Sequence, residues 1–80
     1  MKIQLVAFGI AKDILKAKQM EYELPDGSDI AKLKYSLYGE FPDFTSLKSL
    51  SFAVGENYQG DGFVLRDGDE VVILPPVSGG

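Results

Sequence analysis

Two early stretches of the chain alternate apolar and polar side chains, as β-strands do. In residues 2–8, KIQLVAF, the side chains of Ile3, Leu5 and Ala7 fall on one face, because successive side chains of a strand point to opposite sides. In residues 20–24, MEYEL, apolar and acidic side chains alternate, so one face can be buried while the acidic face meets water. We therefore predict two strands that pair with each other like a hairpin.

A different spacing indicates helices. Apolar residues recur at intervals of three and four through residues 30–39, which predicts a main helix with one apolar stripe. Ser28 and Asp29 precede this helix and are N-cap candidates, whereas Pro42 follows it and favours a loop or a short helical turn. Residues 11–18 contain good helix formers and predict a short helix between the first two strands.

The second half of the chain predicts further strands. Residues 50–54 form a third candidate, and residues 63–65 form a short edge segment. Residues 71–74 are apolar at four consecutive positions, which is typical of a central strand covered on both faces. We expect this last strand to lie parallel to the first in the mixed sheet of an α+β fold. The main helix would cover one face and leave a partly apolar surface around Phe8 and the last strand for a partner.

Length and composition fit one compact domain. The 80 residues, 45% of them hydrophobic, can build a single core. We predict a folded domain over residues 1–74 and a flexible tail over residues 75–80. No apolar run approaches the ~20 residues of a membrane span, and no signal-peptide pattern is present. We therefore expect a cytoplasmic protein without a membrane partner.

Charge and missing residue types exclude several activities. The formal net charge of -4 disfavours a nucleic-acid partner, because such partners need clustered Lys and Arg. An acidic domain instead favours a basic protein surface. The chain has no Cys and no His, so it offers no disulfide, no thiolate, no imidazole base and none of the common zinc sites. Alone, the chain is poorly equipped for catalysis.

The acidic residues of the last third do not predict a metal site. Asp61, Asp67, Asp69 and Glu70 lack the alternating ligand spacing of a calcium loop and are typical of turns. We therefore expect no bound metal and no intrinsically bound cofactor.

The last six residues begin with two prolines, which stiffen the backbone, and end with two glycines, which have no side chains. Pro75 and Pro76 hold the backbone near polyproline geometry, and six extended residues reach roughly 20 Å from the domain. Gly79 and Gly80 carry no Cβ, so a narrow channel can close around them. The segment that we predict to insert into a partner comprises Pro75, Pro76, Val77, Ser78, Gly79 and Gly80.

The carboxylate of Gly80 is the group that this chain can offer as an unhindered acyl donor. A free carboxylate is a poor electrophile, because its charge and resonance repel nucleophiles. We therefore expect a partner enzyme to activate it with ATP as an acyl-adenylate. Sulfur delivered to the same carbon would give a terminal thiocarboxylate, which a partner could hold in a water-poor site against an electrophilic substrate.

A known family matches these features. Residues 68–80, GDEVVILPPVSGG, closely resemble the ending of the small, sulfur-carrying subunits of molybdopterin synthases. Residues 52–58 are similar to the same family, and Phe8-Gly9 ahead of Lys12 matches its first strand and following turn more loosely.

The resemblance implies a fold, partners and a reaction. The fold would be a ubiquitin-like β-grasp with a protruding tail, and the partners would be a larger synthase subunit, in a heterotetramer, and an ATP-using adenylating enzyme. Gly80 would carry the thiocarboxylate and Gly79 would hold it in a channel. The synthase would insert sulfur into precursor Z, a cyclic pyranopterin, to make molybdopterin, with its catalytic groups on the large subunit.

Some assignments remain open between two interpretations. Phe8 could help to fill a partner interface or pack within the domain, and Lys12 and Arg66 could pair with acidic residues of a partner or be solvated surface charges. A related carrier for thiamine synthesis, tRNA thiolation or protein conjugation would share the tail but not the partner. An inert β-grasp interaction module is the other alternative.

Overall fold

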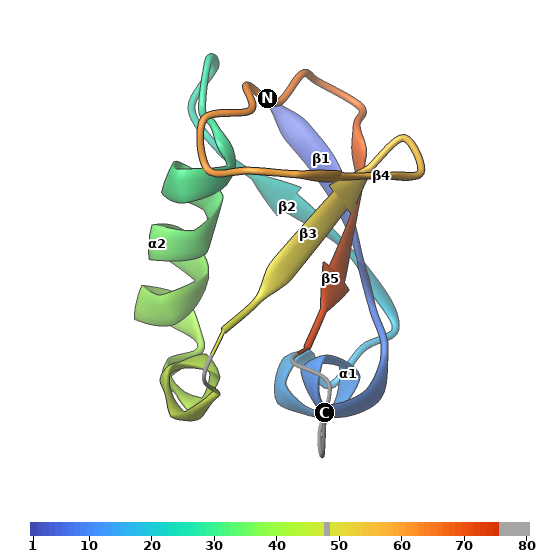
Figure 1. Cartoon of the computed structure of the whole chain (residues 1–80), viewed down its shortest axis with the longest axis vertical. Helices are drawn as coiled ribbons and strands as arrows, with labels where there is room; N and C mark the ends of the chain where they lie inside the picture. The colour runs from blue at the N-terminus through green and yellow to red at the C-terminus, as the bar shows by residue number, and fades with distance from the viewer. Residues whose placement is uncertain (48, 76–80) are drawn as a thin grey trace.

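The chain folds into one mixed β-sheet with its main helix packed on one face (Figure 1). The structure is a computed structural model that describes residues 1–47 and 49–75. Its strands are β1 (Lys2–Ala7), β2 (Gln19–Glu23), β3 (Ser51–Val54), β4 (Asn57–Gln59) and β5 (Glu70–Leu74), and its helices are α1 (Gly9–Leu15), α2 (Ile30–Glu40) and the 3₁₀ helix η1 (Pro42–Ser46). Across the sheet the strand order is β2-β1-β5-β3-β4.

The first and last strands are neighbours at the centre of the sheet. β1 and β5 run parallel, with Leu5 opposite Val71, whereas β1 with β2, β3 with β5 and β3 with β4 are antiparallel pairs. The predicted parallel pairing and the predicted pairing of the first two strands are therefore confirmed. The connection between β1 and β2 contains helix α1 and is therefore longer than a tight hairpin turn.

The edge strand is not where the sequence predicted it. Residues 63–65 contribute only an isolated bridge between Val64 and Asp29, and β4 occupies the edge instead. The reason is the turn between β3 and β4, in which Gly55 and Glu56 both have positive φ, of 60° and 73°. Tight two-residue hairpin turns require this backbone geometry, so the chain folds back at once and pairs residues 57–59 with β3.

The core lies between the sheet and the helices. Alternate residues of β1 and β5 are fully buried against the apolar stripe of α2 and against Phe44 of η1. The predicted inward face of the first strand is confirmed. The expectation that the main helix covers one face and leaves the other open is confirmed, because α2 lies on one side of the sheet and Val72 and Leu74 on the other side are half-buried. The four apolar positions of the last strand therefore do not mean that both of its faces are covered.

The ends of the helices follow from local hydrogen bonds. Asp29 caps α2, because its Oδ1 accepts the backbone N–H of Lys32 at 2.9 Å. The Ser28 hydroxyl instead donates to the carbonyl oxygen of Pro25 at 2.6 Å. Helix α1 begins two residues earlier than predicted, at Gly9, and ends three residues earlier, because the backbone turns left-handed at Lys16.

The described part of the chain, residues 1–47 and 49–75, contains no helix that is both long and apolar enough to cross a membrane.

Candidate functional site

The end of β5 places Pro75 against the start of α1. Pro75 is half-buried, and a Cβ built on Gly9 would lie 3.8 Å from Pro75 Cγ. Gly9 has φ of +57°, which most side chains resist, so it can start the helix directly after β1. Figure 1 shows α1 beside the end of β5, and we call this place, where Pro75 lies beside Gly9, the tail root.

The rest of the predicted tail lies outside the described residues. This holds for Pro76, Val77, Ser78 and Gly79, and for Gly80, the predicted site of adenylation and thiocarboxylation.

The predicted interface residues divide between the two ends of the sheet. Phe8 is 46% exposed and is the N-cap residue of α1, next to the tail root. Lys12 is exposed in the same helix. Arg66 is exposed at the other end, in the loop that leads into β5, where its backbone pairs with Asp69. The structure therefore brings Phe8 and Lys12 to the tail root but not Arg66.

The face of the sheet opposite α2 carries an apolar band that leads to the tail root. Across the strands, Val6 lies opposite Val72, Val72 opposite Ala53, and Ala53 opposite Tyr58. Tyr58 is 74% exposed, although a strand partner holds its backbone. We define the apolar band as these side chains together with two at the end nearest the tail; its members are Val6, Phe8, Ala53, Tyr58, Val72 and Leu74.

Sequence reasoning found part of this band. It identified the outer surface around Phe8 and the last strand, but it missed Ala53 and Tyr58. The alternation of residues 51–54 could have indicated Ala53, because Phe52 and Val54 point into the core. Tyr58 carried no such signal, because β4 is short and polar on both sides of it.

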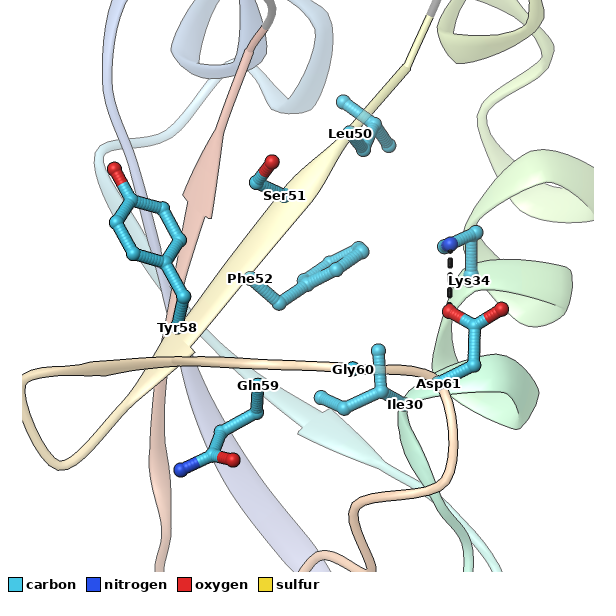
Figure 2. A pocket seen from close by; sticks show the side chains of 9 residues that line it. All are labelled: Ile30, Lys34, Leu50, Ser51, Phe52, Tyr58, Gln59, Gly60 and Asp61. Carbon is cyan, nitrogen blue, oxygen red and sulfur yellow. Dashed lines mark hydrogen bonds and ion pairs between the residues drawn. The ribbon is translucent and has the colours of Figure 1, made fainter.

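A hollow lies along β3, between α2 and the β3–β4 hairpin (Figure 2), and its lining includes Tyr58 of the apolar band. It measures about 340 Å³, and Phe52 projects toward it from β3. Its charged groups are Lys34 and Asp61, whose Nζ and Oδ1 atoms pair at 2.8 Å. These two groups form an ion pair with each other, and no other charged residue among those that the structure describes lines the hollow, so it shows no pair of acid and base groups apart from them.

The described residues hold no visible metal centre. Among residues 1–47 and 49–75, no group of three or more His, Cys, Asp or Glu side chains is arranged to hold a metal ion. Within the same ranges, every buried side-chain nitrogen or oxygen has a hydrogen-bond partner, so no buried polar atom is aimed at a missing ligand.

The geometry thus defines a class of protein. A small domain with a five-stranded mixed sheet and one main helix packed on one face has the ubiquitin-like β-grasp fold, as do the solved structures that it resembles. The chain belongs to the ThiS family, whose model matches residues 6–80. The predicted fold is confirmed.

Named relatives narrow the likeness further. The chain is 32% identical to a molybdopterin synthase sulfur carrier subunit of Chlamydomonas reinhardtii, with 100% of both sequences covered. Its fold resembles that of a putative molybdopterin converting factor subunit 1 from Pyrococcus furiosus, with a TM-score of 0.87, 23% identity and coverage of 96% of this chain and 99% of that one. The resemblance to sulfur-carrying subunits is confirmed.

One similar structure is a complex. A protein–protein complex of subunits 1 and 2 of the molybdopterin-converting factor from Helicobacter pylori contains a chain that is 25% identical, with a TM-score of 0.68 and 100% of both chains covered. Similar proteins are therefore known with a partner subunit bound.

Proposed function

We propose that this chain is the sulfur-carrier subunit of a molybdopterin synthase. The observation that carries the proposal is the likeness, over the whole chain, to a protein named as such a subunit. The family match, which extends through the final glycines, supports a role for the tail as well as for the folded body. The chain would act in the cytoplasm with a larger synthase subunit in a heterotetramer.

The reaction begins at the carboxylate of Gly80. One carboxylate oxygen attacks the α-phosphorus of ATP on an adenylating enzyme, and pyrophosphate leaves. A sulfur nucleophile then displaces AMP from the acyl carbon, so that the terminus exchanges one oxygen for one sulfur. The sulfur of the resulting thiocarboxylate attacks precursor Z, and water then cleaves the bond between this sulfur and the acyl carbon, which leaves the sulfur on the pterin and restores the Gly80 carboxylate. The chain itself binds neither metal nor cofactor in this scheme, and the ATP is held by the activating partner.

In this proposal the folded domain binds the large subunit, and the tail extends into the active site of that subunit. Residues 1–74 would present the apolar band to the large subunit, and residues 75–80 would extend from the tail root, where Pro75 lies beside Gly9, into its active site. Phe8 belongs to this band and Lys12 lies near the tail root, so both would take part in the interface. The large subunit would supply the acid and base groups that this chain lacks.

Intact-mass spectrometry tests the proposal. The chain is incubated with ATP, a sulfur donor and the adenylating enzyme of its own organism, and we expect its mass to rise by the difference between one sulfur and one oxygen atom. A variant that lacks Gly80 is the matched control and should not gain this mass. The loaded chain, mixed with the large subunit and precursor Z, should then form molybdopterin.

The alternatives give other results. A carrier for thiamine synthesis, tRNA thiolation or protein conjugation would gain the sulfur but would neither bind the large subunit nor support molybdopterin formation. An inert interaction module would gain no mass. Either result would contradict the proposal.

A further inference from the structure

The outer face of the sheet changes from apolar to acidic along its length. One row across the strands contains Val6 and Val72 and belongs to the apolar band. In the next row, two residues further from the tail root, Gln4 lies between Glu21 of β2 and Glu70 of β5. The outer face therefore has an apolar end near the tail and an acidic end away from it.

Two cationic residues of the described chain lie at the acidic end, Lys2 and Arg66, and no ion pair of Arg66 is present there. Lys2 lies on the same face, and its Nζ is 3.8 Å from Glu21 Oε1. Within residues 1–47 and 49–75, no ion pair involves Glu56, Asp69 or Glu70. Asp69 Oδ2 accepts the backbone N–H of Arg66 at 2.9 Å, which leaves its charge without a cationic partner in that part of the chain.

The side chains of Glu56, Asp69 and Glu70 line a hollow on this face, together with apolar residues. It measures about 340 Å³ and lies between the β3–β4 turn and the turn before β5. Glu56, Asp69 and Glu70 supply its carboxylates, whereas Ala53 and Val72 supply apolar surface shared with the apolar band. We name this hollow, with its three carboxylates, the acidic hollow.

A long basic side chain matches this combination. Lys and Arg carry an aliphatic stem that can lie on apolar surface while the charged head stays at the rim. A stem lying over Val72 would bring such a head to the carboxylates of Glu56 and Glu70. Arg is the better match where two carboxylates are available, because its planar guanidinium donates in several directions.

We infer that the acidic hollow receives Lys or Arg side chains of the large synthase subunit, from a segment whose apolar residues cover the apolar band. This inference rests on the proposed function, and it assigns the partner's chemistry at the end of the interface furthest from the tail. The acidic hollow orients the two proteins and speeds their encounter, while the apolar band supplies most of the affinity.

A second copy of this chain is a poor occupant. Two outer faces brought together with their acidic ends aligned would place carboxylates against carboxylates, and like charges in contact oppose association. Turned end to end, two copies would leave each acidic hollow against apolar side chains of the other apolar band rather than against a cation. The continuity of the acidic hollow with the apolar band instead favours one partner that covers both.

Charge reversal with a salt series tests the inference. Affinity and association rate for the cognate large subunit are measured for the unchanged chain, for Glu70→Lys and for Glu56→Lys. We expect each reversal to lower the affinity about tenfold at low salt, mainly through a slower association rate. The loss should shrink when the salt rises to about 0.5 M, because screening weakens the charge term.

The matched control is Asp43→Lys, which changes the net charge equally but lies on η1, away from the outer face. We expect it to bind like the unchanged chain, and thermal unfolding of each variant shows that the fold is intact. Equal binding and equal salt dependence for all three variants would overturn this inference alone.

Two other outcomes bear on different claims. Failure of the unchanged chain to bind the large subunit would overturn the proposed function as well. Self-association of the chain through this face, measured by sedimentation and altered by Glu70→Lys, would overturn the choice of the large subunit as the occupant.

Discussion

Gly9 and Pro75 lie side by side, so the first turn of α1 faces the first residue after β5. The space beside Gly9 would accept a methyl group at ordinary contact distance, 3.8 Å from Pro75 Cγ, but Gly9 has φ of +57°. We expect Gly9→Ala to lower the free energy of unfolding by about 1 kcal/mol, because a side chain is disfavoured in the left-handed region. Urea denaturation measures this loss.

Gly39→Ala is the matched control for this change. Gly39 lies within α2, and a Cβ there would meet nothing within 4 Å. The same substitution should therefore stabilise the domain, by up to about 1 kcal/mol, because alanine is the better helix former. If both variants shifted stability in the same direction, the conformational account of Gly9 would be wrong.

The cap of α2 predicts a second loss of stability. Asp29→Ala removes the oxygen that accepts the Lys32 N–H at 2.9 Å and should cost about 1 kcal/mol. Asp26→Ala is the comparison, because Asp26 pairs with the N-terminal amine while its side chain is 92% exposed. An exposed pair of this kind contributes little, so we expect a smaller change in thermal unfolding. Equal losses would argue against the cap.

A large-to-small substitution in the core should cause the largest loss in the free energy of unfolding. Phe44 is completely buried and packs edge-on against Phe41, with ring centroids 6.2 Å apart. We expect Phe44→Ala to cost about 3–5 kcal/mol, which is a large share of the stability of a small domain. Tyr35→Ala, at a residue that is 75% exposed, should change the free energy of unfolding by less than about 1 kcal/mol. Circular dichroism during heating compares the two, and similar midpoints would contradict the assigned core.

Ionisation of the Tyr22 hydroxyl should lower the stability of the folded domain at high pH. Burial raises the pKa of the Tyr22 hydroxyl above its ordinary value of 10.0, and so do the hydrogen bond to Glu40 and the charge of Glu40, while a hydrogen bond with Ser36 opposes them. Because the folded state favours the protonated phenol, this contribution is complete below about pH 10 and is lost as the pH rises through the folded-state pKa. Tyr22→Phe should remove that part of the pH dependence.

Chemical denaturation at a series of pH values measures this difference. The unchanged chain should be more stable than Tyr22→Phe near pH 7, by about 1 kcal/mol, because its hydroxyl donates to Glu40 Oε1 at 3.1 Å. The advantage should narrow above pH 10. A constant gap between the two proteins across this range would show that Tyr22 does not titrate as described.

Strong local patterns made much of the fold predictable from sequence. The alternation in residues 2–8 placed Ile3, Leu5 and Ala7 correctly in the core, and the three-and-four spacing located α2 to within a residue of its end. The apolar run of the last strand indicated its central position, but it could not show that α2 covers only one face. Which face of a strand a helix covers depends on the packing of elements that are distant in sequence, so it cannot be predicted from the residues of the strand alone.

Backbone geometry explains what the sequence did not reveal. The position of β4 depends on the left-handed conformation of Glu56, which glutamate rarely adopts, so residues 63–65 were the more apolar and more obvious candidates for the edge strand. The acidic hollow combines the β3–β4 turn with the turn before β5, and only the antiparallel pairing of β3 with β5 joins them. The sequence analysis identified Asp69 and Glu70 only as turn residues and did not single out Glu56.

The parallel pairing of β1 with β5 also governs when the domain can form during its synthesis. β1 emerges from the ribosome early, but its central neighbour is translated last among the strands, and β3 joins the sheet only through that neighbour. Contacts between segments so distant along the chain form slowly, because a long loop must close before any of them exists. A nascent chain that stalls before β5 would thus lack the central strand that joins β1 to β3, and with it Val72 of the apolar band.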